Sequence, residues 1–363
     1  MLKKVVMMLV LLTAILVIAA CGNNNEEVDN TGAADNSNEE QNNNDQNADA
    51  EADDGDSIKI IAAHNQTDPE NPYQDGLLAF KEAAESESGG SIEVEVHAGT
   101  LGTDEAELVE SLQVGGADVV LVSPGFMSNT GIREIDLFAL PYLFESYEHW
   151  EQTVDGEVGD EIAQIVQEES DDLFKMIGYW TAGVRHYYGK QPLESIDDLD
   201  GMTIRTQTSG VVADFWSQTG AVPTDVDWGE LYQALQQNVV DSAENAYPYF
   251  VQQNHHETDN GRYTTETGHD YTTRFLLINN ERFESFSEEH QEILLSAAEA
   301  SVEAERQALY EQEDEYKQIL LDDGGEVNEI DQTPFIEIAE PLQDEVAEEI
   351  GVTHLLEQIR DMR

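Results

Sequence analysis

The chain has very little of two things on which many functions depend, cysteine and positive charge. It contains a single cysteine, which rules out an intramolecular disulfide. Its 363 residues include only 16 lysines and arginines against 77 acidic side chains, for a formal net charge of −61. A chain this acidic repels phosphates, which argues against nucleic acid as a partner. It also argues against an anionic membrane surface as a partner of the main body.

The motifs of common enzymes are missing as well. The sequence has no G-x-S-x-G nucleophile elbow, no glycine-rich phosphate loop and no H-E-x-x-H zinc motif. Three histidines, His255, His256 and His269, could in principle form a metal site, but adjacent histidines point in different directions on regular structure. We therefore expect neither an enzyme nor a cofactor or a metal ion.

What the chain has in excess is acid, and this has a physical cost. A large net charge keeps a protein soluble but makes its compact state repel itself. Salt reduces this cost, because the Debye length falls to about 3 Å at 1 M ionic strength. The composition therefore indicates a halophile-like acidic protein exposed to a salty or alkaline exterior. The alternative is a protein that is merely acidic.

The N-terminus has the pattern of a secretion signal. Lys3 and Lys4 precede an apolar run over residues 5–20. The run is shorter than the roughly 20 residues of a membrane span and is typical of a signal peptide. It ends Ile18-Ala19-Ala20-Cys21, which resembles the bacterial lipobox. We predict a signal peptide over residues 1–20 and a lipid on Cys21 that anchors the protein to the outer face of the cell membrane. The alternative is a plain signal peptide that happens to contain a cysteine.

The segment that follows, residues 21–56, is rich in Asn, Asp and Glu. Val28 is its one large aliphatic residue, so it cannot bury enough apolar surface to fold. Its acidic residues lack the spacing of a calcium-binding loop. We predict a disordered acidic tether, with a root-mean-square reach of about 30–35 Å.

The body of the chain opens with alternating strand and helix patterns. Strands are expected at residues 58–63, 92–96 and 119–122, and helices at 73–85 and 105–113. The run at 119–122 is continuously apolar, which is typical of a parallel sheet that is covered on both faces. This order predicts an α/β fold.

A long helical pattern follows later in the chain. It runs from Glu288 to Leu321 without a glycine or a proline, with Ser287 as its expected N-cap and Gly324 beyond its end. The pattern predicts either one helix that bridges two lobes or two helices with a kink. Thr103 is expected to cap the earlier helix that begins at Glu105. The other predicted elements are strands at 202–205 and 272–278, an apolar segment at 174–180, and helices at 157–168, 211–219, 230–237 and 342–350.

Four segments carry a family resemblance. They are GTLGTDEAELVESLQVGGADVVLVS (99–123), IDLFALPYLF (135–144), VRHYYGKQPLESIDDLDGMTIRT (184–206) and GAVPTDVDWGELYQALQQNVVDSAEN (220–245). Across nearly all of residues 57–363, the chain resembles the DctP-type extracytoplasmic solute receptors of TRAP (tripartite ATP-independent periplasmic) transporters. The last segment carries the most specific pattern, G-x-x-P-T…E-x-Y-x-A-L-Q…V-V-D…E-N.

The resemblance implies a two-lobed, periplasmic-binding-protein-like clamshell of α/β type, with a long helix across both lobes. Lobe I would comprise residues 57–181 and about 270–308, and lobe II residues 182–269 and about 309–363. The clamshell would close on a small ligand and deliver it to the small and large membrane subunits of the permease, which an ion gradient drives.

The resemblance also assigns site residues. Arg205 occupies the position of the family arginine that binds the ligand carboxylate, and a planar guanidinium suits this role because it makes two parallel hydrogen bonds to a carboxylate. The alternative for Arg205 is a structural salt bridge. Arg185 matches a second family arginine near the crossover between the lobes. Asn245 matches the asparagine of the E-N step, although Ala246 replaces a frequent proline. Trp228 stands where relatives often place an aromatic residue that lines the pocket.

Four further candidates follow predicted strands. His64, Asn65 and Gln66 come after the first strand, and Ser123 comes after the third. In open α/β sheets, ligands bind outside the carboxyl ends of the strands, so these side chains are candidate contacts.

The expected ligand is a small carboxylate, either a C4-dicarboxylate or another organic acid. One alternative is a receptor for a compatible solute such as ectoine. Others are a solute-binding lipoprotein of an ABC transporter or of a signalling system.

Overall fold

The computed structural model describes residues 57–127, 130–207 and 210–363. The predicted signal peptide, Cys21 and the acidic tether lie outside the described residues. Asp53–Arg363 form one compact unit, and the fold described below belongs to it. Within the described part of the chain, no helix combines the length and the apolar character needed to cross a membrane.

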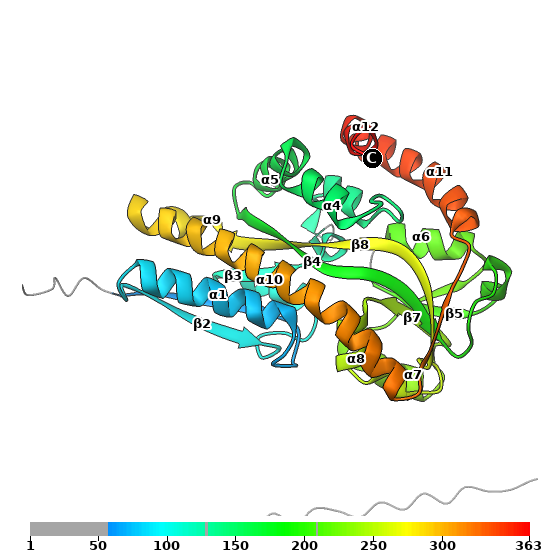
Figure 1. The fold of residues 1–363 in the computed structure, drawn as a ribbon. Helices are drawn as coiled ribbons and strands as arrows, with labels where there is room; N and C mark the ends of the chain where they lie inside the picture. The colour runs from blue at the N-terminus through cyan, green and yellow to red at the C-terminus, as the bar shows by residue number, and fades with distance from the viewer. Residues whose placement is uncertain (1–56, 128–129, 208–209) are drawn as a thin grey trace, which may run out of the picture. The chain divides into compact units, whose positions relative to one another are not determined.

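The described residues form one mixed sheet of nine strands, with strand order β2-β1-β3-β8-β4-β7-β5-β6 and with β9 paired to β8 (Figure 1). The outer groups, β2-β1-β3 and β7-β5-β6, are parallel, whereas β8 and β4 between them pair antiparallel with each other and with their neighbours β3 and β7. The strands are β1 (Ile58–His64), β2 (Ile92–Ala98), β3 (Val119–Val122), β4 (Phe174–Gly189), β5 (Thr203–Thr206), β6 (Val222–Asp225), β7 (Ser242–Asn245), β8 (Tyr263–Asn279) and β9 (Glu326–Glu329).

The two long strands β4 and β8 join the two parallel groups. Their pairing shifts register three times, and two of the shifts lie close together, between Thr181 and Val184 and between Arg185 and Tyr187. Gly183 lies at this irregularity with a φ of +80°, which favours glycine, and a Cβ there would approach the Cβ of Ala246 to 2.8 Å. The sheet therefore bends where the long strands pass from one parallel group to the other.

Helices cover both faces of the sheet. α10 packs on α1 and β4 near one end and on α8 and β9 near the other, and Figure 1 shows it crossing in front of β4 and β8. The α-helices are α1 (Pro72–Glu87), α2 (Glu105–Gln113), α3 (Pro124–Met127), α4 (Tyr147–Val154), α5 (Glu157–Glu169), α6 (Gly210–Gln218), α7 (Leu231–Gln236), α8 (Tyr247–Gln252), α9 (Asn280–Glu284), α10 (Glu288–Asp322), α11 (Thr333–Glu349) and α12 (Thr353–Asp361), and the 3₁₀ helices are η2 (Glu134–Ala139), η3 (Ile196–Leu199), η4 (Trp228–Glu230) and η5 (His255–Glu257).

Several predicted elements agree with the structure, and others need correction. The long pattern forms a single helix, α10, and the Oγ of its N-cap Ser287 accepts a hydrogen bond from the amide of His290. The N-cap of α2 is Asp104 rather than Thr103, because the Asp104 carboxylate accepts the amide of Ala106. The C-terminal region is also more helical than predicted, since α11 continues through Pro341 and α12 follows it.

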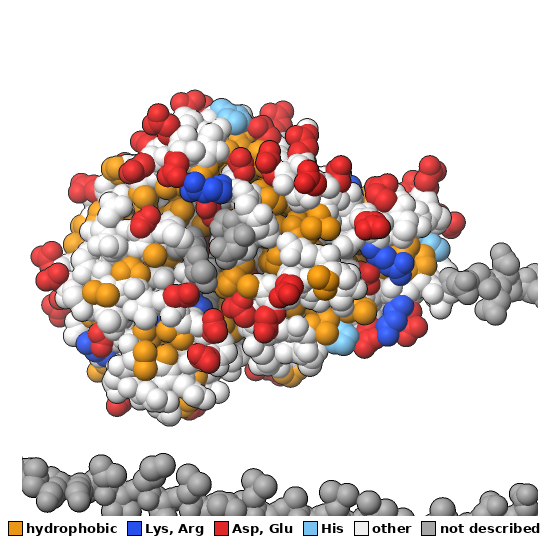
Figure 2. Space-filling view, turned by 180° about the vertical axis from the view of Figure 1, so that it is seen from behind, with side chains coloured by type: hydrophobic (Ala, Val, Ile, Leu, Met, Phe, Trp, Pro, Cys, Tyr) orange, Lys and Arg blue, Asp and Glu red, His pale blue; other side chains and the backbone are white. Residues whose placement is uncertain are grey.

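The predicted fold class, a two-lobed α/β fold with one long helix, is confirmed. One large hydrophobic cluster includes residues of both predicted lobes, such as Val120 and Trp216, so the packing of the core does not mark where one lobe ends. The lobe boundaries therefore stay a prediction. Acidic side chains are scattered over the face in Figure 2, and few basic side chains lie among them.

Candidate ligand-binding site

A small cavity lies where several predicted site residues meet. The space that it leaves for a ligand measures only about 20 Å³, far below the roughly 300–1,000 Å³ of small-molecule pockets, so an organic acid would enter only after the surrounding side chains move apart. It lies at the ends of β1, β5 and β7, and its lining residues are Asn65, Gln66, Asp104, Glu105, Phe126, Arg205, Gln207, Trp228, Asn245, Tyr249 and Arg274. The cavity thus combines two cations, two acids and several amides with aromatic rings.

Arg205 contributes the most open positive charge to this cavity. It lies in β5 and is only 3% exposed. Its Nε donates to the carbonyl oxygen of Val226 at 2.8 Å, and the guanidinium lies 5.8 Å from the ring centroid of Trp228. Among the described residues, its two Nη atoms have no hydrogen-bond partner. Burial lowers the pKa of Arg205 from its ordinary value. A bound carboxylate would pair with the open edge of the guanidinium and offset this cost of burial.

Asn245, the last residue of β7, faces the same cavity with a fixed orientation. Its Oδ1 accepts hydrogen bonds from Arg185 Nη1 at 3.0 Å and from the amide of Ala246 at 2.9 Å. Its Nδ2 has no partner among the described residues. Since Oδ1 is already used twice, the amide presents donor hydrogens to a ligand.

Arg185 lies behind the cavity wall and is bound to acid. Its Nη2 donates to the Glu244 carbonyl oxygen at 2.6 Å and to Glu244 Oε1 at 2.8 Å, and its Nε pairs with Glu244 Oε2. His269 Nε2 also lies 3.2 Å from Glu244 Oε2. Burial would raise the pKa of the Glu244 carboxyl, but Arg185 and His269 outweigh this effect and lower the pKa to about 2. This network holds Asn245 in place.

On the other side of the cavity, Asn65 and Gln66 leave β1 and form a polar corner. Gln66 Nε2 donates to Asn65 Oδ1 at 3.1 Å, while Gln66 Oε1 is buried without a hydrogen-bond partner. His64 supports this corner, because its Nδ1 accepts the amide of Gln66 at 3.2 Å and its Nε2 bonds to Gln74 Oε1 at 3.0 Å. Burial lowers the pKa of His64 to about 4, so the ring is neutral at pH 7. The unpartnered oxygen of Gln66 is an acceptor that a ligand hydroxyl could satisfy.

The predicted residues therefore fall into two groups. Five of them line the cavity: Arg205, Trp228, Asn245, Asn65 and Gln66. The other three lie behind it, and each makes a hydrogen bond to a lining residue: Arg185 to Asn245, His64 to Gln66, and Ser123 to Glu105. The second group is placed to orient side chains of the first.

Sequence reasoning missed Glu105 and Arg274, which form a buried pair on the cavity wall. Arg274 lies in β8, and its Nε is 3.8 Å from Glu105 Oε1 and 2.8 Å from the Tyr73 hydroxyl oxygen. Burial would lower the pKa of Arg274, but Tyr73 and Glu105 outweigh it and raise the pKa above its usual range. The signal for Arg274 was an arginine within the apolar run TTRFLLI of a chain with few basic residues.

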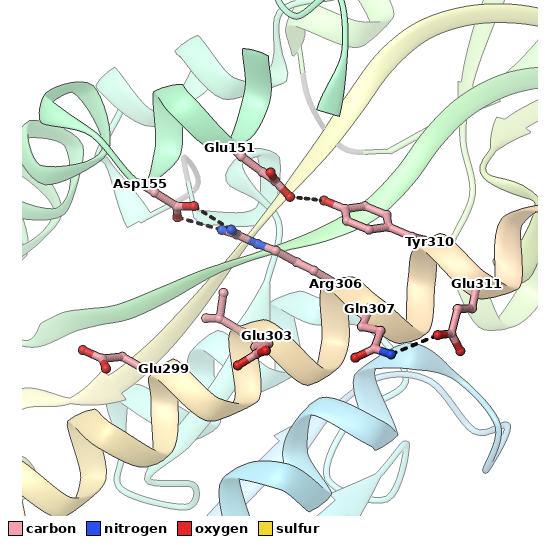
Figure 3. Close-up of a pocket in the computed structure, with 9 residues that line it drawn as sticks. Glu151, Asp155, Glu299, Glu303, Arg306, Gln307, Tyr310 and Glu311 are labelled. Carbon is pink, nitrogen blue, oxygen red and sulfur yellow. Dashed lines mark hydrogen bonds and ion pairs between the residues drawn. The ribbon is translucent and has the colours of Figure 1, made fainter. Parts of the chain in front are cut away.

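A wider cavity, of about 650 Å³, lies between α4 and α10 and contains none of the predicted site residues (Figure 3). It is lined mainly by acids, including Glu151 and Asp155. Its one lining arginine, Arg306, donates two hydrogen bonds to Asp155, of 2.6 and 2.8 Å. Tyr310 donates to Glu151 at 2.7 Å. Because its positive charge is already paired, this cavity does not suit an anion.

The three candidate histidines have separate partners. His255 Nδ1 bonds to the Tyr188 hydroxyl, His256 lies near Asp323 and His269 near Glu244. Across residues 57–127, 130–207 and 210–363, no cluster of three or more His, Asp or Glu side chains is arranged to hold a metal ion.

Comparisons with known proteins identify the family to which this chain belongs. The model of the family "Bacterial extracellular solute-binding protein, family 7" (DctP) matches residues 62–350, and the chain belongs to this family. The C4-dicarboxylate-binding periplasmic protein DctP of Rhodobacter capsulatus is 26% identical over 296 residues, which cover 80% of this chain and 87% of that protein. An uncharacterized protein of Salmonella typhimurium, YiiZ, is 32% identical over 291 residues, which cover 79% of this chain and 86% of that protein.

Two similar crystal structures contain sugar acids. A TRAP periplasmic solute-binding protein of Sulfitobacter sp. NAS-14.1, with bound β-D-galacturonate, has a TM-score of 0.78 and 27% identity, over 84% of this chain and 99% of that chain. A second one, of Chromohalobacter salexigens with bound D-glucuronate, has a TM-score of 0.79 and 25% identity, over 84% of this chain and 100% of that chain.

Proposed function

We propose that this chain is the extracytoplasmic solute receptor of a TRAP transporter and that it binds a small organic acid whose carboxylate lies on Arg205. The observation that carries the proposal is the buried guanidinium of Arg205, whose two Nη atoms have no partner among the described residues of a polar cavity. Relatives that bind a C4-dicarboxylate or hold a uronate support a carboxylate ligand. Asn245, Asn65 and Gln66 would bind the remaining polar groups.

Binding would close two lobes over the ligand. We place lobe I at residues 57–181 and about 270–308, and lobe II at residues 182–269 and about 309–363. The bend in β4 at Gly183 supports a hinge there, because its register shifts interrupt the regular pairing of the two long strands. The closed receptor would deliver its ligand to the small and large membrane subunits of the permease.

We further propose that the receptor works outside the cell membrane and is held there by a lipid on Cys21. The support is the lysine-led apolar run that ends in Ala-Ala-Cys. Metabolic labelling with palmitate tests the anchor. We expect label on the wild-type protein and none on Cys21→Ser. A labelled Cys21→Ser protein would contradict the anchor and leave the binding function untouched.

Calorimetric titration of the purified protein tests the binding function. A suitable panel contains C4-dicarboxylates, hexuronates, other sugar acids and ectoine, measured in high salt. We expect at least one acid to bind, and Arg205→Ala to abolish that binding, because the ligand carboxylate would lose its only open cation among the described lining residues. An Arg205→Ala protein that binds the same acid as tightly as the wild type would disprove the role of Arg205. Binding of ectoine alone would favour the compatible-solute alternative.

A further inference from the structure

The cavity holds a second arginine, and its environment differs from that of Arg205. Arg274 and Glu105 are 5% and 4% exposed, and both line the cavity. They come from β8 and from the first turn of α2, whereas Arg205 comes from β5 and Asn245 from β7. Because β8 pairs with β3 while β5 pairs with β6 and β7, the two arginines lie on different parts of the sheet. A ligand in this cavity therefore meets an open cation from one part and a cation paired with an acid from the other.

The hydrogen bonds around this pair show which of its atoms remain for a ligand. Glu105 Oε2 accepts the amide and the hydroxyl of Ser123, both at 2.6 Å, so this oxygen is fully used. Glu105 Oε1 has Arg274 Nε at 3.8 Å, which is too long for a hydrogen bond. Arg274 Nε donates to Tyr73 and Nη1 donates to the Thr273 carbonyl oxygen. Among the described residues, Arg274 Nη2 has no partner. The pair thus offers one carboxylate acceptor and one guanidinium donor.

We propose that the Arg274–Glu105 pair selects acids that carry hydroxyl groups at the end remote from the carboxylate, and rejects acids that carry a second carboxylate there. A hydroxyl can donate to Glu105 Oε1 and accept from Arg274 Nη2 at the same time. The buried Gln66 Oε1, which also lines the cavity without a partner, adds a second acceptor for a hydroxyl. The substrate class is therefore a polyhydroxylated monocarboxylate, such as a hexuronate.

A second carboxylate fits the same place poorly. It has no hydrogen to give to Glu105 or Gln66, and Asp104 and Glu105 both line the cavity beside it. The charge of Arg274 is already balanced by Glu105, so a second ligand carboxylate would add an uncompensated negative charge in a buried site. This inference rests on the proposed function, in which Arg205 holds the first carboxylate.

Calorimetry or competition with three matched sugar acids tests the inference. D-galacturonate is the hydroxylated monocarboxylate, and L-galactonate is its open-chain counterpart, in which the aldehyde carbon is reduced to CH2OH. Galactarate differs from L-galactonate only in that a second carboxylate replaces the terminal CH2OH group. We expect the wild-type protein to bind L-galactonate at least about 100-fold more tightly than galactarate, because galactarate loses hydrogen bonds to the site and is repelled by its acids.

Glu105→Gln provides the decisive variant. The substitution keeps the size of the side chain but removes the charge that balances Arg274. We expect the affinity for galactarate to rise by about tenfold or more, while the affinity for D-galacturonate falls. Ser123→Ala is the matched control, because it removes a hydrogen bond to the same carboxylate and leaves the charge in place. Ser123→Ala should weaken the binding of all three acids alike and keep the ratios of their affinities within about threefold of the wild-type ratios.

The outcomes separate this inference from the proposed function. If Arg205→Ala binds the acids as tightly as the wild type, the proposed function fails. If Arg205→Ala loses binding but Glu105→Gln keeps the wild-type ratio, only the inference fails. If Glu105→Gln does not fold, the ratio of the wild-type affinities for the open-chain monocarboxylate and for galactarate tests the inference by itself. A wild-type protein that binds galactarate, succinate or malate as tightly as the monocarboxylates overturns the inference.

Discussion

Arg205 and Arg306 are both buried, and each lines a cavity, but their surroundings differ. Arg306 donates two hydrogen bonds to Asp155 and one to the Tyr179 carbonyl oxygen, and its guanidinium lies 4.6 Å from the ring centroid of Trp150. Among the described residues, Arg205 makes one hydrogen bond, to a backbone oxygen. Burial lowers the pKa of Arg205, whereas at Arg306 Asp155 outweighs burial and raises the pKa. Within the described part of the chain, the Arg306 guanidinium has an acidic partner and the Arg205 guanidinium has none.

The comparison shows that cavity volume is a poor guide to the binding site in this protein. The wider cavity, at Arg306, is lined mainly by acids. Its one lining arginine is already paired with Asp155. The smaller cavity holds the open guanidinium of Arg205 together with amides that still have free donors or acceptors. An anion gains the most binding free energy beside a buried cation that has no acidic partner. There the ligand replaces the solvation that the cation lost on burial.

The largest expected effect follows from exchanging Arg205 for an apolar side chain of similar length. Arg205→Met should weaken binding of the cognate acid by at least about 100-fold, or roughly 3 kcal/mol. The unfolding free energy of the ligand-free protein should stay constant or rise by about 1 kcal/mol, because an incompletely paired buried charge is removed. Titration calorimetry and urea unfolding measure the two quantities. A large loss of stability would mean that Arg205 is a structural residue.

The same exchange at Arg306 should give the opposite result. Arg306→Met should lower the unfolding free energy by about 1–3 kcal/mol, a range reduced from that of fully buried ion pairs because Asp155 is half-exposed. Affinity for the acid should stay within about threefold of the wild type. Urea unfolding of both methionine variants in the same buffer makes the comparison direct. A loss of binding in Arg306→Met would show that the wider cavity takes part in ligand binding.

A third, smaller effect concerns Glu305, the residue before Arg306 in α10. Its side chain is fully buried, Oε1 has no partner, and burial raises its pKa to about 8. The folded state therefore holds a proton that the unfolded state loses above its ordinary pKa of 4.5. Stability should fall as pH rises from about 4.5 to 8 and then level off. Glu305→Gln should remove this dependence and stabilise the protein by on the order of 1 kcal/mol or more at pH 8, with little effect at pH 5. Thermal melts of the wild type and of Glu305→Gln at pH 5 and pH 8 check this. An equal change in melting temperature at both pH values would contradict it.

Much of the fold was predictable because local patterns determine it. Apolar runs identified β1 and β3, and a long pattern without glycine or proline, capped at Ser287, identified α10. The full length of β8 was missed, because its first half, YTTETGHDY, is polar and contains a glycine, although four of its nine residues are buried and none is exposed. Burial by neighbouring strands overrides the polar composition, and a single sequence does not show which strands are neighbours.

The candidate site was predictable only in part, for the same reason. The family resemblance pointed to Arg205 and Asn245, and Asn65 and Gln66 follow a predicted strand, so the sequence alone made them candidates. The pair of Arg274 with Glu105 joins β8 to α2 across the order of the sheet, which the sequence does not reveal. The partnership of Arg185 with Glu244 likewise depends on the antiparallel register of β4 and β7.

A crystal structure of the protein with D-galacturonate tests the difference between the two arginines most directly. We expect the ligand carboxylate to lie about 2.7–2.9 Å from the Nη atoms of Arg205, with the sugar hydroxyls near Glu105 and Arg274. The Arg306–Asp155 pair should remain intact. A galacturonate bound at Arg306, or a carboxylate held away from Arg205, would contradict the role assigned here to the open guanidinium.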